Sequence, residues 1–140
     1  MKSLIAAAIL STVNITAFSP AYAEIAVIVH PSNSNVISTS EIERIFLGKV
    51  SNFSDGSSAI PLNLGEENAT RDEFNTKVLK RGGSQLKAYW SKMIFTGKGQ
   101  PPKELADDAA AKAAVASNPN AISYIKSSSV DGGVKVIASF

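Results

Sequence analysis

Residues 60–74, Ile60-Pro61-Leu62-Asn63-Leu64-Gly65-Glu66-Glu67-Asn68-Ala69-Thr70-Arg71-Asp72-Glu73-Phe74, contain a change from strand to helix. The apolar residues 60–64 predict a short strand, with Pro61 at its start or at a sheet edge. Thr70 is followed three residues later by Glu73, the pattern of a capping box, so we expect a helix to begin at Thr70. Free backbone N–H groups of the helix start then lie at the end of a strand, where α/β sheets commonly bind anions.

Two interpretations of this transition remain open. In the first, Asn68, Ala69, Thr70 and Arg71 form an anion site in which the N–H groups of residues 70 to 72 donate hydrogen bonds. The side chains of Asn68 and Thr70 donate further bonds, and Arg71 adds a charged contact. In the second, Thr70 only caps its own helix, which is the more frequent role of a capping box, and Arg71 is an ordinary surface residue.

The preceding residues predict one strand and one helix. Residues 25–29, Ile-Ala-Val-Ile-Val, form a β-branched apolar run that is typical of a buried strand. Ser38 and Glu41 match a capping box, and the helix that they begin should end near Gly48. A strand, a helix and a second strand at residues 60–64, in this order, favour a parallel βαβ unit.

The following residues predict three more helical segments and two strands. The helix from Thr70 should end at Lys80 and Arg81, with Gly82-Gly83 as its left-handed cap. A helix from Ser84 to Phe95 repeats apolar residues at helical spacing, which predicts a stripe that faces the core, made of Leu86, Trp90, Met93 and Ile94. A loop over 96–102, a helix over 107–117 and strands over 121–125 and 134–137 complete the expected elements.

Residues 1–23 have the pattern of a secretory signal peptide. Lys2 provides the positive start, Leu4 to Val13 is apolar, and Ala21-Tyr22-Ala23 is a small-residue cleavage site. The apolar run is about half of the ~20 residues that cross a bilayer, so we do not expect a membrane-spanning helix. The expected domain is then residues 24–140, and we expect it in the periplasm.

Composition and charge exclude several classes of protein. The chain has 140 residues, 44% of them hydrophobic and 19% charged, which is typical of one globular domain. Without the leader, which contains one basic and no acidic residue, it has 13 basic and 12 acidic side chains and a net charge of +1. The basic residues are spread along the sequence rather than gathered on one helix, so we expect no nucleic-acid partner.

Few residues could support catalysis, a cofactor or a metal. The absence of Cys excludes disulfides, thiolate metal sites and a Cys nucleophile, and His30 is the single His. A role of His30 as a general base is less probable than that of a hydrogen-bonded loop residue, since no nucleophile motif accompanies it. The pairs Glu66-Glu67 and Asp107-Asp108 lie near helix starts, as solvated acids do, and Thr96–Gly99 only weakly resembles a phosphate loop. We expect no enzyme, no cofactor and no metal.

Three segments together resemble the periplasmic phosphate-binding proteins of ABC importers. Residues 40–53, Ser-Glu-Ile-Glu-Arg-Ile-Phe-Leu-Gly-Lys-Val-Ser-Asn-Phe, are similar to a segment L-s-x-x-x-i-x-x-I-F-x-G-k-i-x-x-W of that family. Residues 68–74 are similar to its S-G-T-R-x-x-F phosphate loop, and residues 119–125 to its p-G-A-I-G-Y-v strand. The likeness is closest to short, single-domain members of the family.

The resemblance implies a fold, a ligand and partners. The fold would be α/β, a single lobe of a type II periplasmic-binding-protein fold with a small mixed sheet and flanking helices. Asn68, Ala69 and Thr70 stand where the family's loop binds phosphate, so the resemblance implies binding of phosphate or a similar anion, in phosphate uptake or its sensing. An ABC permease, a sensor protein or a second copy of the chain would be partners. The alternative is an interaction or sensory protein that keeps the fold without tight ligand binding.

Overall fold

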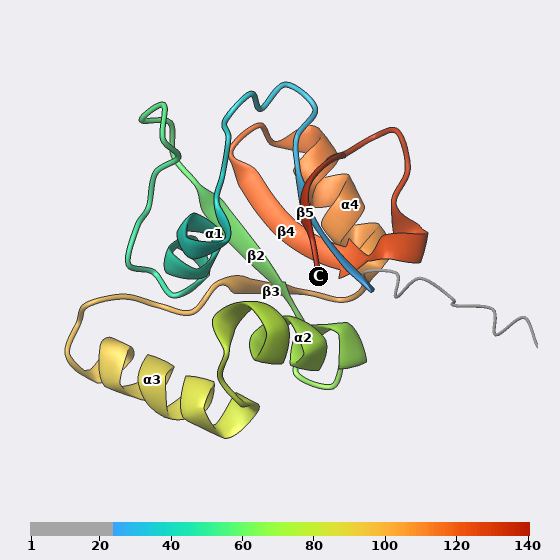
Figure 1. The fold of residues 1–140 in the computed structure, drawn as a ribbon. Helices are drawn as coiled ribbons and strands as arrows, with labels where there is room; N and C mark the ends of the chain where they lie inside the picture. Colours follow the sequence, from blue (N-terminus) through green and yellow to red (C-terminus); the bar gives the residue numbers. More distant parts are fainter. Residues whose placement is uncertain (1–23) are drawn as a thin grey trace, which may run out of the picture.

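Residues 24–140 are described by the computed structural model, and they form one mixed sheet with flanking helices (Figure 1). The expected leader, residues 1–23, lies outside the described residues. The strands are β1 (Ile25–Val29), β2 (Ile60–Leu64), β3 (Lys103–Leu105), β4 (Ala121–Lys126) and β5 (Lys135–Ser139). The helices are α1 (Thr39–Phe46), α2 (Ala69–Phe74), α3 (Gly83–Phe95) and α4 (Asp108–Ser117), with a π-helical turn η1 (Asn75–Leu79) and a 3₁₀ turn η2 (Ser127–Ser129).

The five strands lie in the order β3-β2-β4-β1-β5. Strand β2 is parallel to β3 and β4, whereas β1 is antiparallel to both β4 and β5. The predicted small mixed sheet is therefore confirmed. The predicted parallel βαβ unit of residues 25–29 and 60–64 is wrong, because β4 lies between these strands and β1 runs in the opposite direction. The parallel neighbours of β2 are instead β3 and β4, and the chain passes from β2 to β3 through α2, η1 and α3.

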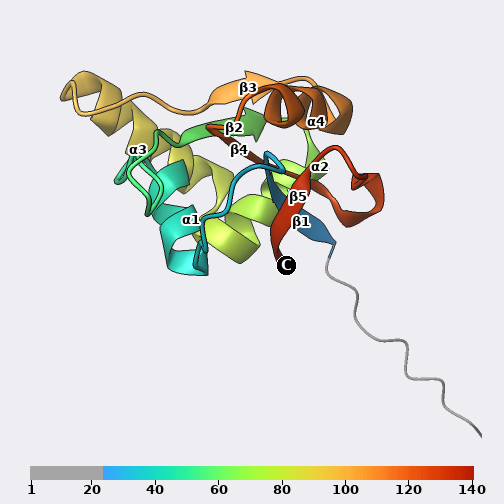
Figure 2. The same ribbon diagram turned by 90° about the horizontal axis from the view of Figure 1, so that it is seen from above.

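The core lies on both faces of the sheet. All five residues of β1 are buried, as predicted, because α4 covers one face while α1 and α2 cover the other (Figure 2). On the α1 and α2 face, the aromatic rings of Phe46, Phe74 and Tyr124 pack together, with 3.9 Å between the ring centroids of Phe74 and Tyr124. This stack fixes α2 above the centre of the sheet.

The start of α1 agrees with its local sequence. Ser38 Oγ accepts a hydrogen bond of 3.2 Å from the Glu41 N–H, and the Glu41 carboxylate accepts one of 2.8 Å from the Ser38 N–H. The predicted capping box is confirmed. The apolar face of the helix, Ile42, Ile45 and Phe46, is buried.

The segment after α2 ends earlier than predicted. The helix passes directly into η1, and Lys80 ends it in the left-handed conformation with φ of 55°. The N–H groups of Lys80 and Arg81 both donate to Asn75 O, which closes the wide π turn before Gly82 is reached. Gly82 is extended and precedes α3 instead of capping α2.

Helix α3 does not lie against the sheet. Leu86 is buried, but Trp90 and Met93 are only half-buried, and Ile94 is 53% exposed. Figure 1 shows α3 beside the sheet, beyond α2. The prediction of a core-facing stripe is wrong beyond Leu86. Helical spacing shows that one side of a helix is apolar, but it does not show which part of the chain, if any, buries that side. Residues 96–102 are a connection, as predicted.

Strand β3 was not predicted. Lys103-Glu104-Leu105 shows neither an apolar run nor a long alternation, and it pairs with β2 over three residues at the edge of the sheet. The last helix and the last two strands lie close to their predicted ranges. Among residues 24–140, no helix is both long and apolar enough to cross a bilayer.

Candidate functional site

The helix that follows β2 is capped by Asn68 and not by Thr70. Asn68 has extended backbone, and its Oδ1 accepts a hydrogen bond of 2.9 Å from the Thr70 N–H. The prediction of a Thr70–Glu73 capping box is therefore wrong by two residues. Both Asn and Thr are good N-caps, and the helix begins at the earlier of the two, Asn68, which is nearer to the end of β2.

The N–H groups that we expected to be free are largely used within the chain. The Thr70 N–H donates to the Asn68 side chain, and the N–H groups of Arg71 and Asp72 donate to Asn68 O at 3.0 and 3.4 Å. The Ala69 N–H has no acceptor within residues 24–140. An anion at this turn would meet the Ala69 N–H directly, and it would have to displace Asn68 Oδ1 to reach the Thr70 N–H.

The four predicted site residues line three hollows of the surface, two of which adjoin. Asn68 lines a hollow beside the start of α4, and Ala69 and Thr70 line a second hollow next to it. The two hollows share Lys126 and Ser128, so Asn68, Ala69 and Thr70 lie around one region at the end of β4. Arg71 lines a separate groove below α2. The structure therefore brings three of the four residues together and not the fourth.

Arg71 is engaged by a carboxylate. Its Nη1 lies 2.6 Å from Glu104 Oε1 and 3.0 Å from Leu64 O, and its side chain is only 15% exposed. Glu104 thus takes the place at Arg71 that a small oxyanion would occupy. This partner comes from β3, the strand that the sequence patterns did not reveal.

The groove that contains Arg71 lies between α2, α3 and β3. Its volume is about 440 Å³, and Leu86, Trp90 and Ile94 form its apolar side. Asn75 also lines the groove. It is only 5% exposed, and its side chain forms no hydrogen bond with the rest of the described chain.

The hollow at Asn68 contains both signs of charge. Asp107, Asp108 and Asp131 line it together with Lys112 and Lys126. Asp107 caps α4 through the Ala110 N–H, and Asp108 Oδ2 accepts from the Lys126 N–H and the Ser129 hydroxyl. The pKa of Asp131 is lowered, chiefly by the hydrogen bond from the Gly133 N–H and then by Lys112. Asp107 and Asp108 were expected to be solvated, but both accept hydrogen bonds within the chain. Asp107 caps α4, and Asp108 joins the start of α4 to the end of β4.

A buried polar contact supports the end of β2. The Tyr124 hydroxyl donates to Asn63 Oδ1, and the Leu64 N–H donates to the Tyr124 oxygen at 3.3 Å. Burial raises the pKa of Tyr124. Because Tyr124 also stacks on Phe74, this contact fixes β2 relative to α2, on either side of the Asn68 turn.

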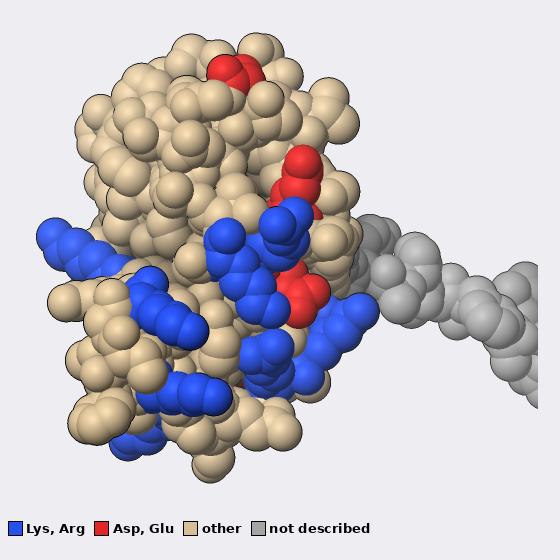
Figure 3. Space-filling view, turned by 90° about the vertical axis from the view of Figure 1, so that its left-hand side faces the viewer, with Lys and Arg blue, Asp and Glu red and all other residues tan. Residues whose placement is uncertain are grey.

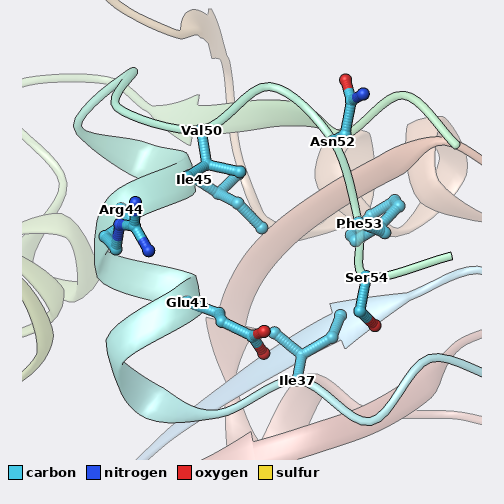
Figure 4. Close-up of a pocket in the computed structure, with 8 residues that line it drawn as sticks. All are labelled: Ile37, Glu41, Arg44, Ile45, Val50, Asn52, Phe53 and Ser54. Carbon is cyan, nitrogen blue, oxygen red and sulfur yellow. The ribbon is translucent and has the colours of Figure 1, made fainter. Parts of the chain in front are cut away.

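Two other places carry no predicted function. His30 Nδ1 lies 2.7 Å from Ser32 Oγ and accepts the Ser32 N–H, which is the local loop role and not that of a catalytic base. A cavity of about 230 Å³ lies under the 52–58 turn, where Ile37, Ile45, Val50 and Phe53 line it (Figure 4). Figure 4 shows Arg44 on the side of α1 away from Phe53, and Glu41 is already part of the helix cap.

The comparisons with known proteins identify the fold. No family model and no curated protein matches this sequence. Among solved structures, the chain is similar to a Vibrio cholerae ABC-type phosphate transport receptor, with TM-score 0.65 and 18% identity over 86% of this chain and 47% of that one. It is also similar to PstS from Borrelia burgdorferi, with TM-score 0.61 and 11% identity over 84% and 47% of the two chains.

A third similar structure contains the anion itself. It is a Clostridium perfringens protein described as a phosphate ABC transporter substrate-binding protein, solved with bound phosphate. The TM-score is 0.62 and the identity 22%, over 83% of this chain and 44% of that chain. The chain therefore spans less than half the length of each of these three proteins, and its fold is that of a single lobe of a phosphate-transport binding protein.

Proposed function

We propose that the protein is a non-enzymatic periplasmic binding lobe for phosphate or a similar small oxyanion, which binds at the Asn68–Thr70 turn. The observation that carries the proposal is the unused Ala69 N–H at the start of α2, beside Thr70 and Lys126 at the end of the parallel strands. Helix starts at this edge of an α/β sheet are suited to anions. The likeness to phosphate-transport binding proteins supports the same assignment.

The proposed site is open on one side, so we expect weak binding. A few charge-assisted hydrogen bonds, less the entropy lost on association, give dissociation constants in roughly the micromolar to millimolar range. A partner that covers the turn would strengthen binding. An ABC permease, a sensor protein or a second copy of the chain would each serve, in phosphate uptake or its sensing.

An NMR titration with inorganic phosphate tests the proposal. Amide shifts should saturate and concentrate at residues 66 to 71 and 126 to 129, with smaller shifts for sulfate and acetate. Thr70→Val removes the hydroxyl without removing the Asn68 cap, and it should weaken phosphate binding. Thr76→Val is the matched control, since Thr76 lies on the exposed side of the same helical segment. Unsaturated shifts at about ten millimolar phosphate would contradict the proposal, because even a weak specific site saturates in that range.

The Arg71–Glu104 pair favours a second candidate function. An arginine already neutralised by the chain's own carboxylate suits a lobe that presents its surface to another protein. Unchanged amide shifts with phosphate, together with retention of this protein by a periplasmic partner, would support this second function over the first.

The periplasmic location rests on residues 1–23. We propose cleavage after Ala23, which would leave Glu24 as the first residue. Intact-mass measurement of the exported protein tests this, and a folded, membrane-bound product that retains Lys2 would contradict it.

A further inference from the structure

The charges of the chain are divided between two regions. Residues 75–103, here called the basic arm, contain seven basic residues and no acidic one: Lys77, Lys80, Arg81, Lys87, Lys92, Lys98 and Lys103. All twelve acidic residues lie in the rest of the sequence. The basic residues are not gathered on one helix, but half of them lie in this segment. The small net charge hides a strongly basic region.

The basic arm consists of η1, α3, the connections on either side of α3 and the first residue of β3, and its charges face solvent. Figure 3 shows Lys and Arg side chains crowded over the lower half of the face on which α3 lies, and hardly any over the upper half. Five exposed lysines of the arm form no ion pair with any carboxylate among residues 24–140: Lys80, Lys87, Lys92, Lys98 and Lys103. Within the described part of the chain, these charges have no neutralising partner.

The end of α3 adds exposed apolar groups to this charge. Phe95 is 92% exposed and Ile94 is 53% exposed. After the helix, Gly97 takes a left-handed conformation and the Lys98 N–H donates to Met93 O, so the chain folds back over the helix end. Lys92 and Lys98 stand three residues before and three residues after Phe95, and all three are exposed. An exposed aromatic ring with lysines around it forms a projecting tip.

We propose that the basic arm docks on a membrane surface that contains anionic phospholipid, with Phe95 at the contact. Lysines near such a surface are attracted by its negative potential, and an aromatic ring inserts at the level of the headgroups. Phe95 does not line the groove between α2, α3 and β3, and its 92% exposure shows that the ring projects from the surface. A projecting tip fits a soft, fluid surface better than it fits a rigid protein partner, which would require a complementary hollow.

Sedimentation of the protein with lipid vesicles tests the proposal. The protein should sediment with phosphatidylcholine vesicles that contain about one third phosphatidylglycerol, and not with phosphatidylcholine alone. Raising the salt to about 0.5 M should release it, because exposed charges are then screened. The inference is independent of phosphate binding, so the vesicle assay is done without phosphate, and either proposal can fail alone.

Two pairs of variants locate the contact. Lys92→Gln with Lys98→Gln should weaken vesicle binding about 25-fold, at roughly fivefold for each lysine. Arg44→Gln with Lys135→Gln removes the same charge from α1 and β5, at exposed residues outside the arm, and should change binding far less. Phe95→Ser should weaken binding about tenfold, whereas Val36→Ser, which alters an equally exposed apolar residue outside the arm, should not.

Three outcomes would overturn the proposal. The first is equal sedimentation with neutral and anionic vesicles. The second is an equal loss of binding in the arm double variant and in its control double variant. The third is retention on DNA or on an acidic protein without binding to the anionic vesicles. The side chains altered in these variants are exposed: Lys92, Lys98, Phe95 and the apolar control Val36. Circular dichroism should therefore show an unchanged fold.

Discussion

The guanidinium of Arg71 lies 2.6 Å from the carboxylate of Glu104, and this ion pair joins the start of α2 to the edge strand β3. Glu104 is half-exposed, so solvent screens the pair and its contribution to stability is small, about 1 kcal/mol or less. The ion pair matters more for binding than for stability, because it determines whether Arg71 is available to an external anion. The pair is therefore the first target for mutation.

Glu104→Gln should free Arg71 for an added anion. Because Arg71 lines the groove below α2, we expect phosphate to gain a second, weak contact there, worth roughly 1 kcal/mol, while the affinity at the Asn68–Thr70 turn stays unchanged. The free energy of unfolding should fall by less than that amount. Glu43→Gln, which removes an acid from α1, is the matched control. Isothermal titration calorimetry measures both variants, and an equal change in the two would show that only net charge matters.

Tyr124→Phe should destabilise the fold and change its response to alkali. Loss of the hydroxyl removes its bond to Asn63 Oδ1 and its contact with the Leu64 N–H, which still donates to Asn63 Oδ1, so the cost should be about 0.5–1.5 kcal/mol. Burial raises the pKa of Tyr124 above its ordinary 10.0, so above pH 10 the phenol ionises in the unfolded chain before it ionises in the folded one.

The wild-type free energy of unfolding should therefore fall as the pH rises above 10, by up to about 1.4 kcal/mol per pH unit. Tyr124→Phe should lack this fall, and Tyr89→Phe should keep it. Urea unfolding at several pH values measures the slope. An identical slope in Tyr124→Phe and the wild type would assign the alkaline loss to other groups.

Phe74→Ala should destabilise the protein much more than Trp90→Ala. Phe74 is buried in the aromatic stack, and its truncation should cost about 3–5 kcal/mol. Trp90 is half-buried, and we expect its truncation to cost about 1–2 kcal/mol. Urea midpoints compare the two variants. Equal losses would mean that α3 packs more tightly than its exposed face indicates.

Lys80→Gly should stabilise the protein. Lys80 holds a φ of 55°, where a Cβ atom is crowded and a glycine is not. The gain should be about 0.5–1 kcal/mol, since glycine also loses more freedom on folding. Lys80→Ala retains the Cβ and should give no such gain. Thermal unfolding measures both variants, and equal unfolding temperatures for the alanine and glycine variants would contradict this explanation.

Local signals in the sequence predicted the elements that depend on neighbouring residues. The Ser38–Glu41 box and the apolar run over 25–29 act within a few residues of the chain, so their structure follows from their sequence. The cap of α2 was misplaced because Asn68 and Thr70 are both competent caps within two positions of each other. A choice between them depends on where β2 ends in space.

The arrangement of the sheet and the partner of Arg71 depend on distant residues. Arg71 and Glu104 are 33 positions apart, and β3 has too few residues to show a pattern. The apolar spacing along α3 predicted a face toward the core, but only the packed chain shows that Leu86 is buried while Ile94 is 53% exposed. Sequence patterns therefore located the turn of the candidate site and not the groups that compete for it.

The position of β1 has a consequence for the time at which the protein can fold. This strand is the second from the edge of the sheet, and on its outer side it pairs with β5, which begins more than a hundred residues later. The Glu24 N–H also donates to Phe140 O at 2.8 Å. Because β1 is translated long before β5, its outer hydrogen bonds must wait for the end of synthesis. Pairings of such long range slow folding, so β1 should be among the last strands to gain all its hydrogen bonds although it is made first.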